Sequence, residues 1–260
     1  MAKKEAEKFT ASDIMEGMIS VRAVIRGAES GVNDRKIEKI IYDEARGKSR
    51  AKELSYLRAM GYKYGFPVLP VAAEEIESLA LGTSHGGILA VCSPRSFPAA
   101  SAENLPEKGF YVMLEGIEDP YNFGYCLRSL YAAGVTGIIL EKHNWTGVSG
   151  IVARASAGAS EMFDMRVSVD FAETAKAFRA AGYKFAVADK SDKSRSIYDC
   201  ALKFPLLLAV GGERRGNTKA ALEVADEIIE LDYGRDFPAA LSAASAASVI
   251  AFEIFRQNRE

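Results

Sequence analysis

Short apolar runs alternate with amphipathic stretches along the second half of the chain. The apolar runs predict strands at residues 110–114, 137–140, 163–168, 183–188, 205–211 and 227–231. The stretches between them have helical spacing, at residues 122–133, 148–157, 171–181, 217–224 and 239–257. Residues 204–210 are apolar throughout, as expected for a strand buried on both faces. This alternation predicts an α/β fold, with a parallel sheet and helices on both of its faces.

The first half of the chain shows a second, smaller α/β pattern. It predicts helices at 18–28, 51–60 and 74–81 and strands at 37–42, 66–71 and 87–92. Residues 93–106 contain three prolines and several small polar residues, which interrupt every regular pattern. We therefore expect a charged, flexible tail at 1–13, a first domain at 14–95, a linker at 96–107 and a second domain at 108–260.

Composition narrows the class of protein. Of the 260 residues, 48% are hydrophobic, which is enough for a substantial core. No apolar run approaches the roughly 18 residues of a membrane helix, and the charged N-terminus lacks the apolar core of a signal peptide. We therefore expect a cytoplasmic protein without a membrane partner. Three widely separated cysteines and two histidines predict neither a disulfide framework nor a metal site.

A polar turn with Asp119 and Asn122 follows the strand at 110–114, and Arg128 lies in the helix after it. Polar side chains at the carboxyl end of a strand commonly bind ligands in open α/β sheets. Two alternatives stay open: Asn122 caps the helix, alone or in addition to binding, and Arg128 extends to solvent or pairs with a carboxylate. Six residues at about 100° each place the two side chains about 120° apart. They converge on one ligand only if Asn122 lies at or before the first turn.

A glycine-rich turn, Gly-Gly-Glu-Arg-Arg-Gly from Gly211 to Gly216, follows the buried strand. Glycines after a strand let a ligand approach the backbone closely. The turn is not the GxGxxG of dinucleotide-binding proteins, and no Gly-Lys-Ser/Thr makes it a P-loop. Taken alone, it also has the composition of a plain strand-to-helix turn.

Together the two turns resemble the first and second motifs of the SpoU/TrmH-type RNA 2'-O-methyltransferases, which belong to the knotted SPOUT class. The family's second motif has the form G-x-E-x-x-G, here with Glu213 at the acidic position. The third motif is close to Ser-Leu-Asn-Val-Ser in the family, and this chain departs from it at Ala240 and Ser242. In the first half, the sequence around His85 is similar to the His-Gln-Gly ending of the family's substrate-binding domain, with Gly86 in place of Gln.

The resemblance implies a fold and an assembly. The first domain would be an α/β substrate-binding domain with a ribosomal-protein-L30e-like fold. The second would be a parallel-sheet SPOUT methyltransferase domain with a C-terminal trefoil knot. The family's enzymes are homodimers whose methyltransferase domains pack together, so a homodimer is expected. The small residues from Ala239 to Ala251 suit close packing between helices of two such domains.

The resemblance also implies transfer of a methyl group from S-adenosylmethionine to a ribose 2'-hydroxyl of RNA, either rRNA or tRNA. Arg128 would hold a phosphate and stabilise the developing alkoxide, because Arg stays protonated. Asn122 and Glu213 would orient Arg128 and the ribose. No metal is expected. The residues expected to hold the cofactor are Gly211, Leu231, Leu241 and Ser242.

Candidate RNA contacts are mainly basic side chains. The net charge of −2 gives no support to nucleic-acid binding through global charge, and no DNA partner is expected. Residues 1–98, however, carry 15 basic against 13 acidic residues. A charge run is also typical of a solvated face, and a loop histidine such as His85 commonly has no role. The candidates are Arg22, Arg26, Arg46, Lys48, Arg50, His85, Arg214 and Arg215.

Two other functions stay open. A non-catalytic RNA-binding or assembly protein would keep the fold and lose turnover through the changes at Ala240 and Ser242. Binding of S-adenosylmethionine and methyl transfer separate that protein from an enzyme. A nucleotide-dependent oxidoreductase on a doubly wound sheet is disfavoured because GxGxxG is missing. The methyltransferase is favoured because Asn122, Arg128 and Glu213 are all present.

Overall fold

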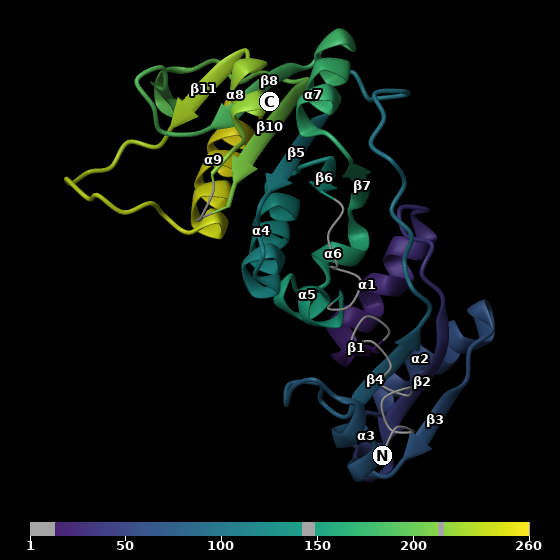
Figure 1. The fold of residues 1–260 in the computed structure, drawn as a ribbon. Coiled ribbons are helices and arrows are strands. Elements are labelled where there is room, and N and C mark those ends of the chain that lie inside the picture. The colour runs from purple at the N-terminus through teal and green to yellow at the C-terminus, as the bar shows by residue number, and fades with distance from the viewer. Residues whose placement is uncertain (1–13, 142–148, 213–215, 260) are drawn as a thin grey trace, which may run out of the picture. The chain divides into compact units, whose positions relative to one another are not determined.

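The computed structural model describes residues 14–141, 149–212 and 216–259. The chain divides into two compact units, which Figure 1 shows as ribbons. The first unit contains the described residues up to 96 together with 149–162, and the second contains the others. Each unit has a sheet of its own.

The first unit is built on a four-stranded sheet with the order β1-β4-β2-β3. Strand β2 pairs parallel with β3 and antiparallel with β4, which also pairs antiparallel with β1. Neighbouring residues of β2 lie on opposite faces, so Ile40 shares a core cluster with Leu57 of α2, and Ile41 shares another with Ile76 of α3. Helices therefore cover both faces. The elements are β1 (Ile14–Glu16), α1 (Gly17–Glu29), β2 (Ile37–Asp43), the 3-10 turn η1 (Glu44–Arg46), α2 (Ala51–Tyr64), β3 (Val68–Val71), α3 (Ala73–Leu79) and β4 (Ile88–Cys92).

Two short helices from the middle of the chain also belong to the first unit. They are α5 (Ser149–Ala155) and α6 (Ala159–Met162). Ala153 of α5 lies in the core of the first unit, and α6 packs on α1. The sequence pattern assigned the helix at 148–157 to the second domain. Its small apolar residues indicate that the helix is buried, but they do not indicate against which sheet.

A buried polar cluster holds α6 in the first unit. Arg35 Nε donates to Glu161 Oε2 at 3.0 Å, and Asn33 Nδ2 donates to the same oxygen at 2.6 Å. Arg35 Nη1 also donates to the carbonyl of Ser93 at 2.8 Å. Arg35 is 3% exposed and Glu161 is 2% exposed. Removing either partner of such a pair leaves a buried charge without compensation, so the position of α6 depends on both.

The second unit is built on seven parallel strands in the order β7-β6-β5-β10-β8-β11-β9. The predicted parallel-sheet α/β fold is confirmed. The chain moves outward from β5 in one direction and from β10 in the other, so these two central strands form the switch point at which open sheets bind ligands. The strands are β5 (Phe110–Glu115), β6 (Gly137–Glu141), β7 (Asp164–Ser168), β8 (Lys184–Ala188), β9 (Arg195–Ser196), β10 (Leu206–Gly211) and β11 (Glu227–Glu230).

Helices cover both faces of this second sheet (Figure 1). Helices α7 (Phe171–Ala180) and α8 (Lys219–Glu223) share a core cluster with Ala209 of β10. Helices α4 (Pro120–Ala132) and α9 (Ala243–Asn258) pack together, and α9 lies near Val210 on the other face of β10. A 3-10 turn, η3 (Ile197–Asp199), follows β9. Within the described ranges, no helix has the length and apolar character needed to cross a membrane.

Side-chain caps decide where α4 and α9 begin. The Asp119 side chain accepts a hydrogen bond from the Asn122 N–H, and Pro120 takes the first helical position. Helix α4 therefore begins two residues before the expected 122. The Ser242 side chain accepts from the N–H of Ser245, so α9 begins after Ser242 and not at the expected 239.

Candidate functional site

Two adjoining cavities lie at the carboxyl ends of the central strands of the second unit. The large cavity, about 270 Å³, is formed by the segments that follow β8, β10 and β11 and by α9. The small cavity, about 170 Å³, is formed by the turn between β5 and α4. Gly212 and Ala243 line both cavities, so the two spaces share a wall. A ligand in the large cavity would therefore lie beside a ligand in the small one.

The large cavity is lined by both apolar and polar residues. Val210, Ile229 and Ile250 are among the apolar ones, and the polar ones are Asp189, Lys190, Asn217, Glu230 and Tyr233. This division suits a ligand that has a flat apolar part and hydrogen-bonding groups at its edges.

Three of the four predicted cofactor residues lie at the large cavity. Gly211, Leu231 and Leu241 line it, from the ends of β10 and β11 and from the segment before α9. The fourth, Ser242, acts as the cap of α9, and its Oγ accepts from the N–H of Ser245 at 3.2 Å. The hydroxyl of Ser242 is thus already used within the chain.

The glycines after β10 serve the chain's own packing. A Cβ on Gly211 would lie 2.3 Å from the carbonyl carbon of Gly216, and a Cβ on Gly212 would lie 2.2 Å from the carbonyl oxygen of Gly116. Both distances are far below contact, and the close neighbours are backbone. The glycines were expected to admit a ligand close to the backbone, but the close approach of other backbone already requires them.

Asn217 is a buried amide at the large cavity that the motif analysis missed. It is 9% exposed, and its Nδ2 donates to the carbonyl of Ala188 at 2.7 Å, which fixes the orientation of the amide. Its Oδ1 is buried and has no hydrogen-bond partner among the described residues. A buried acceptor without a donor costs about 1–3 kcal/mol. This oxygen has almost no accessible surface, so Asn217 shapes the wall of the cavity and does not present its Oδ1 to the space inside.

Asp189 contributes a carboxylate to the lining of the large cavity. Its backbone N–H donates to the carbonyl of Ile229 at 3.0 Å, which fixes the end of β8 against β11. Partial burial raises the pKa of the Asp189 carboxyl above its ordinary value. No sequence signal indicated that Asp189 lies at a site, because it simply follows Ala188 at the end of β8 and belongs to no motif.

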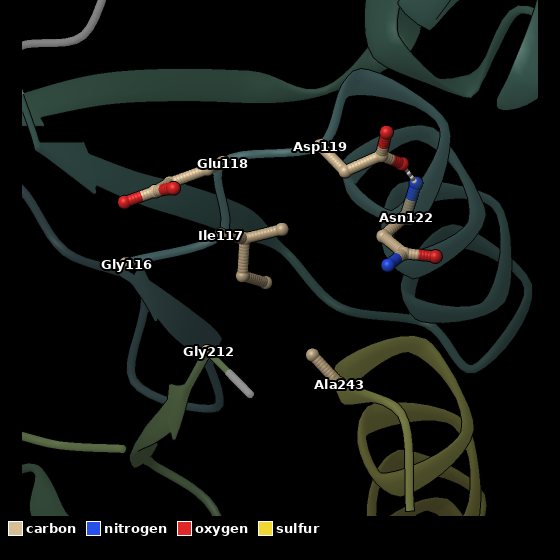
Figure 2. A pocket seen from close by; sticks show the side chains of 7 residues that line it. All are labelled: Gly116, Ile117, Glu118, Asp119, Asn122, Gly212 and Ala243. Atoms are coloured by element: carbon tan, nitrogen blue, oxygen red, sulfur yellow. Dashed lines mark hydrogen bonds between the residues drawn. The ribbon is translucent and has the colours of Figure 1, made fainter. Parts of the chain in front are cut away.

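The small cavity contains the predicted catalytic residue Asn122. Figure 2 shows its carboxamide directed toward the space between Ile117 and Ala243. The backbone N–H of Asn122 donates to Asp119 Oδ1 at 2.7 Å. Asp119 is therefore the cap of α4, and the Asn122 side chain lies within the first turn, as convergence on a ligand with Arg128 requires.

Arg128 lies elsewhere on α4. Its side chain is exposed, and it does not belong to the described lining of either cavity. A single chain therefore does not bring Arg128 and Asn122 together around one of these spaces. Three further predicted site residues, Glu213, Arg214 and Arg215, lie outside the described residues.

Glu115, at the end of β5, joins the two turns that form the cavities. Its carbonyl accepts from the N–H of Gly212 at 2.7 Å, and its Oε2 accepts from the N–H of Thr218 at 3.1 Å. Burial raises the pKa of the Glu115 carboxyl above its ordinary value. Its position beneath both turns makes it a positioning residue.

The predicted RNA contacts of the first unit gather around η1 and the start of α2. The Arg46 Nε pairs with Asp43 at 3.1 Å, and Arg50 Nη1 pairs with Glu53 at 3.0 Å. Lys48 is exposed between them. On α1, Arg22 and Arg26 are also exposed, and the Arg22 guanidinium lies 5.0 Å from the centre of the Tyr56 ring of α2.

His85 is buried, at 4% exposure, so the structure does not support direct contact with RNA. Its Nδ1 accepts from the N–H of Gly87 at 3.1 Å, and its Nε2 lies 3.3 Å from Glu77. A Cβ on Gly86 would lie 2.9 Å from the Arg50 guanidinium. The histidine therefore orders a turn against which a basic side chain rests.

This chain is similar to known proteins over most of its length. Two curated relatives are each named 23S rRNA (guanosine-2'-O-)-methyltransferase RlmB. The one from Shewanella oneidensis is 28% identical over 200 residues, which cover 75% of this chain and 80% of that protein. The one from Bordetella pertussis is 25% identical over 254 residues, which cover 96% of this chain and 100% of that protein.

A solved structure shares the fold. The AdoMet-bound rRNA methyltransferase from Sinorhizobium meliloti has a TM-score of 0.75 to this structure, at 20% identity, with 94% of this chain and 87% of that chain covered. Residues 109–252 of this chain match the model of the SpoU rRNA Methylase family. This span exceeds half of the chain and includes the residues that line both cavities. The resemblance seen in the sequence motifs is therefore confirmed, and this protein belongs to the SpoU rRNA methylase family.

Proposed function

We propose that this protein is an enzyme that transfers a methyl group from S-adenosylmethionine to a ribose 2'-hydroxyl of RNA. The observation that carries the proposal is the pair of adjoining cavities, because Gly212 and Ala243 separate a predicted cofactor space from the space that Asn122 enters. Methyl transfer needs such neighbouring spaces, since donor and acceptor atoms must be aligned. The named relatives act on 23S rRNA, which makes rRNA the preferred substrate class, with tRNA as the other candidate.

The large cavity suits S-adenosylmethionine. Adenine is flat and apolar on its faces, which matches the apolar side chains of Val210, Ile229 and Ile250 in the lining. Its amino group and the ribose hydroxyls are donors, which match the carboxylate of Asp189. Gly211, Leu231 and Leu241 supply the remaining wall.

In the reaction, the bound cofactor supplies a methyl group that is electrophilic because it is carried by a sulfonium. Asn122 would orient the ribose within the small cavity through its carboxamide. Arg128 stays protonated, so it would stabilise the developing alkoxide and hold a neighbouring phosphate. The hydroxyl proton would leave to solvent water as the oxygen–carbon bond forms and the carbon–sulfur bond of the cofactor breaks. Glu213 would orient Arg128.

A homodimer would complete this arrangement. Helices α4 and α9 pack together, and each exposes apolar side chains, which are Tyr121 and Tyr125 on α4 and Val249 and Phe252 on α9. We take these side chains as the candidate dimer face. Arg128 lies on the same side of α4, since positions 121, 125 and 128 follow helical spacing. A second copy packed on this face would cover the aromatic rings and bring its Arg128 into the interface. The trefoil knot formed by the cofactor loops is part of the same proposal.

The first unit would bind the RNA outside the target nucleotide. Its candidate surface consists of Arg22, Arg26, Arg46, Lys48 and Arg50. Arg46 and Arg50 would exchange their carboxylate partners, Asp43 and Glu53, for phosphate groups. Arg214 and Arg215, next to the second motif, would hold a phosphate near the reacting ribose. The proposed place of action is the cytoplasm.

One observation favours a second candidate, a non-catalytic RNA-binding protein. The family's Asn in the third motif is replaced by Ser242, and the hydroxyl of Ser242 caps α9. A chain that had lost turnover would keep both cavities and bind RNA without transferring a methyl group.

The test is methyl transfer from tritiated S-adenosylmethionine to total bacterial RNA lacking the modification, followed by mapping of 2'-O-methyl groups as sites resistant to alkaline cleavage. Incorporation at one ribose establishes the enzyme. Titration calorimetry with S-adenosylmethionine separates the alternatives. Cofactor binding without transfer to any RNA favours the non-catalytic protein, and no cofactor binding by folded protein contradicts the proposed function.

A further inference from the structure

We infer that Tyr233 is a positioning residue that holds Leu241 of the third motif in the wall of the large cavity. The inference rests on the proposed function, because the large cavity is the proposed site of the cofactor. It assigns a role to a side chain that is not among the predicted site residues.

The segment of residues 231–242 leaves β11 and returns to α9 without forming a helix or a strand (Figure 1). Among the described residues, no backbone-to-backbone hydrogen bond holds residues 232–241 in place. The two hydrogen bonds that do hold them use side chains. The Ser196 hydroxyl donates to Asp232, and the backbone N–H of Leu241 donates to the Tyr233 hydroxyl oxygen at 3.1 Å. The conformation of this segment therefore depends on few contacts.

Tyr233 ties the segment together across eight positions. The centre of its ring lies 6.2 Å from the centre of the Phe237 ring, and Lys190 Nζ lies 5.9 Å from the same ring. Tyr233, Lys190 and Leu241 all line the large cavity. The hydrogen bond between Tyr233 and Leu241 therefore joins two residues of one wall that come from opposite ends of the segment.

This contact matters because the third motif of this chain departs from its family at Ala240 and Ser242. The side chain of Ala240 has no polar atom, and the Ser242 hydroxyl accepts from the N–H of Ser245 as the cap of α9. In the described part of the chain, the side chain that holds the backbone N–H of Leu241 is that of Tyr233. The hydroxyl of Tyr233 thus supplies a polar contact at a place where the motif residues supply none.

A wall that is ordered before the ligand arrives binds it more tightly, because less conformational freedom is lost on binding. Without the Tyr233 hydroxyl, the ligand itself would have to order the segment, so its affinity would fall. The transfer step follows binding, so the rate at saturating cofactor would stay the same. Affinity and turnover therefore respond differently to loss of this hydroxyl.

The experiment compares the full wild-type chain with Tyr233→Phe, which removes the hydroxyl and keeps the ring. The Leu241 amide of the variant is expected to exchange its hydrogen faster in NMR, with an unchanged melting temperature. Titration calorimetry is expected to show that S-adenosylhomocysteine binds about three- to tenfold more weakly, the effect of one hydrogen bond. The KM for S-adenosylmethionine should rise by the same factor, while kcat stays within about twofold.

Tyr198→Phe is the matched control and should behave as the wild type, because Tyr198 is 55% exposed and lies outside the described lining of both cavities. Tyr233→Phe protein with the wild-type affinity overturns the inference. A fall in kcat with an unchanged KM also overturns it, because the hydroxyl would then act in the transfer step. A wild type that binds neither S-adenosylhomocysteine nor S-adenosylmethionine contradicts the proposed function itself, which is a different result from either of these.

Discussion

The backbone N–H of Asn122 donates to the Asp119 carboxylate at 2.7 Å, and this bond gives the two residues different tasks. Asp119 caps α4, while Asn122 directs its carboxamide into the small cavity (Figure 2). We therefore predict that stability and chemistry in this turn depend on different side chains.

Substitutions in this turn should separate the two tasks. Asp119→Ala removes the cap and is expected to lower the free energy of unfolding by about 1 kcal/mol. Asn122→Ala is expected to lower methyl transfer at least about tenfold, because it removes a polar group that orients the ribose in the transition state, with a smaller loss of stability. Urea unfolding and single-turnover methylation measure the two effects. Equal loss of stability in both variants would contradict the assignment.

Arg128 should affect transfer and spare cofactor binding. It is exposed and outside the described lining of the large cavity. Arg128→Ala is expected to reduce the transfer rate by about 10²–10³-fold, the range for removing a charge-stabilising donor. The dissociation constant for S-adenosylmethionine should stay within about twofold. Lys219→Ala, an exposed cation on α8, is the control. An Arg128→Ala enzyme with normal turnover would remove this residue from the mechanism.

The exposed apolar face of α4 and α9 should hold two chains together. Phe252 is 46% exposed on α9, and a carboxylate there would be buried in the proposed interface. Phe252→Asp is expected to convert a dimer to a monomer in light scattering after gel filtration. Val169→Asp replaces a side chain that is 96% exposed away from this face and should leave the dimer intact. A dimer that persists in Phe252→Asp would place the interface elsewhere.

The carboxyl of Asp189 should make cofactor-free stability depend on pH. Burial raises its pKa in the folded state, so its protonated form is favoured by folding. Its contribution to stability is present below the pKa of an unfolded Asp, near 3.9, and is lost as pH rises through the folded-state pKa. Asp189→Asn should therefore melt at a higher temperature than the wild type at pH 7, and this difference should shrink as pH falls toward 4. A difference that is constant with pH would mean that the carboxyl does not titrate abnormally.

The basic residues near η1 should give RNA binding its salt dependence. Arg46 and Arg50 lie on the candidate surface of the first unit. The double variant Arg46→Ala with Arg50→Ala is expected to lower the slope of log K against log salt by about one for each phosphate that is no longer neutralised. Lys63→Ala, at the far end of α2, is the control, because Lys63 pairs with Glu29. Equal slopes in the double variant and the wild type would exclude this surface.

Periodicity was enough to predict the second sheet. The turns after β5 and β10 drew attention to Asn122 and Gly211, and the family resemblance added Leu231 and Leu241. All four line the two cavities at one edge of the sheet, while their roles stay predictions. Helix starts were less predictable, because they depend on which polar side chain captures a free N–H, as Asp119 and Ser242 do.

Long-range packing could not be predicted from local patterns. His85 resembles an exposed loop residue in sequence, but the turn it orders buries it. Asn217 belongs to no periodic pattern and no recognised motif. The orientation of its amide is set by the carbonyl of Ala188, which is 29 positions away in the sequence. The allocation of α5 and α6 to the first unit depends on Arg35 and Asn33, which are more than 100 residues away in sequence from Glu161.

Helices α5 and α6 belong to the first unit but lie between two segments of the second unit in the sequence. The two units therefore cannot be separated as genetic modules. The chain leaves the second unit after β6, contributes two helices to the first and returns at β7. A fragment ending at residue 96 would lack Glu161, the partner of Arg35. A fragment starting at residue 97 would contain α5 and α6 without the core of the first unit against which they pack. Exchange of the first unit between related chains by simple fusion at the proline-rich segment would therefore fail unless α5 and α6 were exchanged with it.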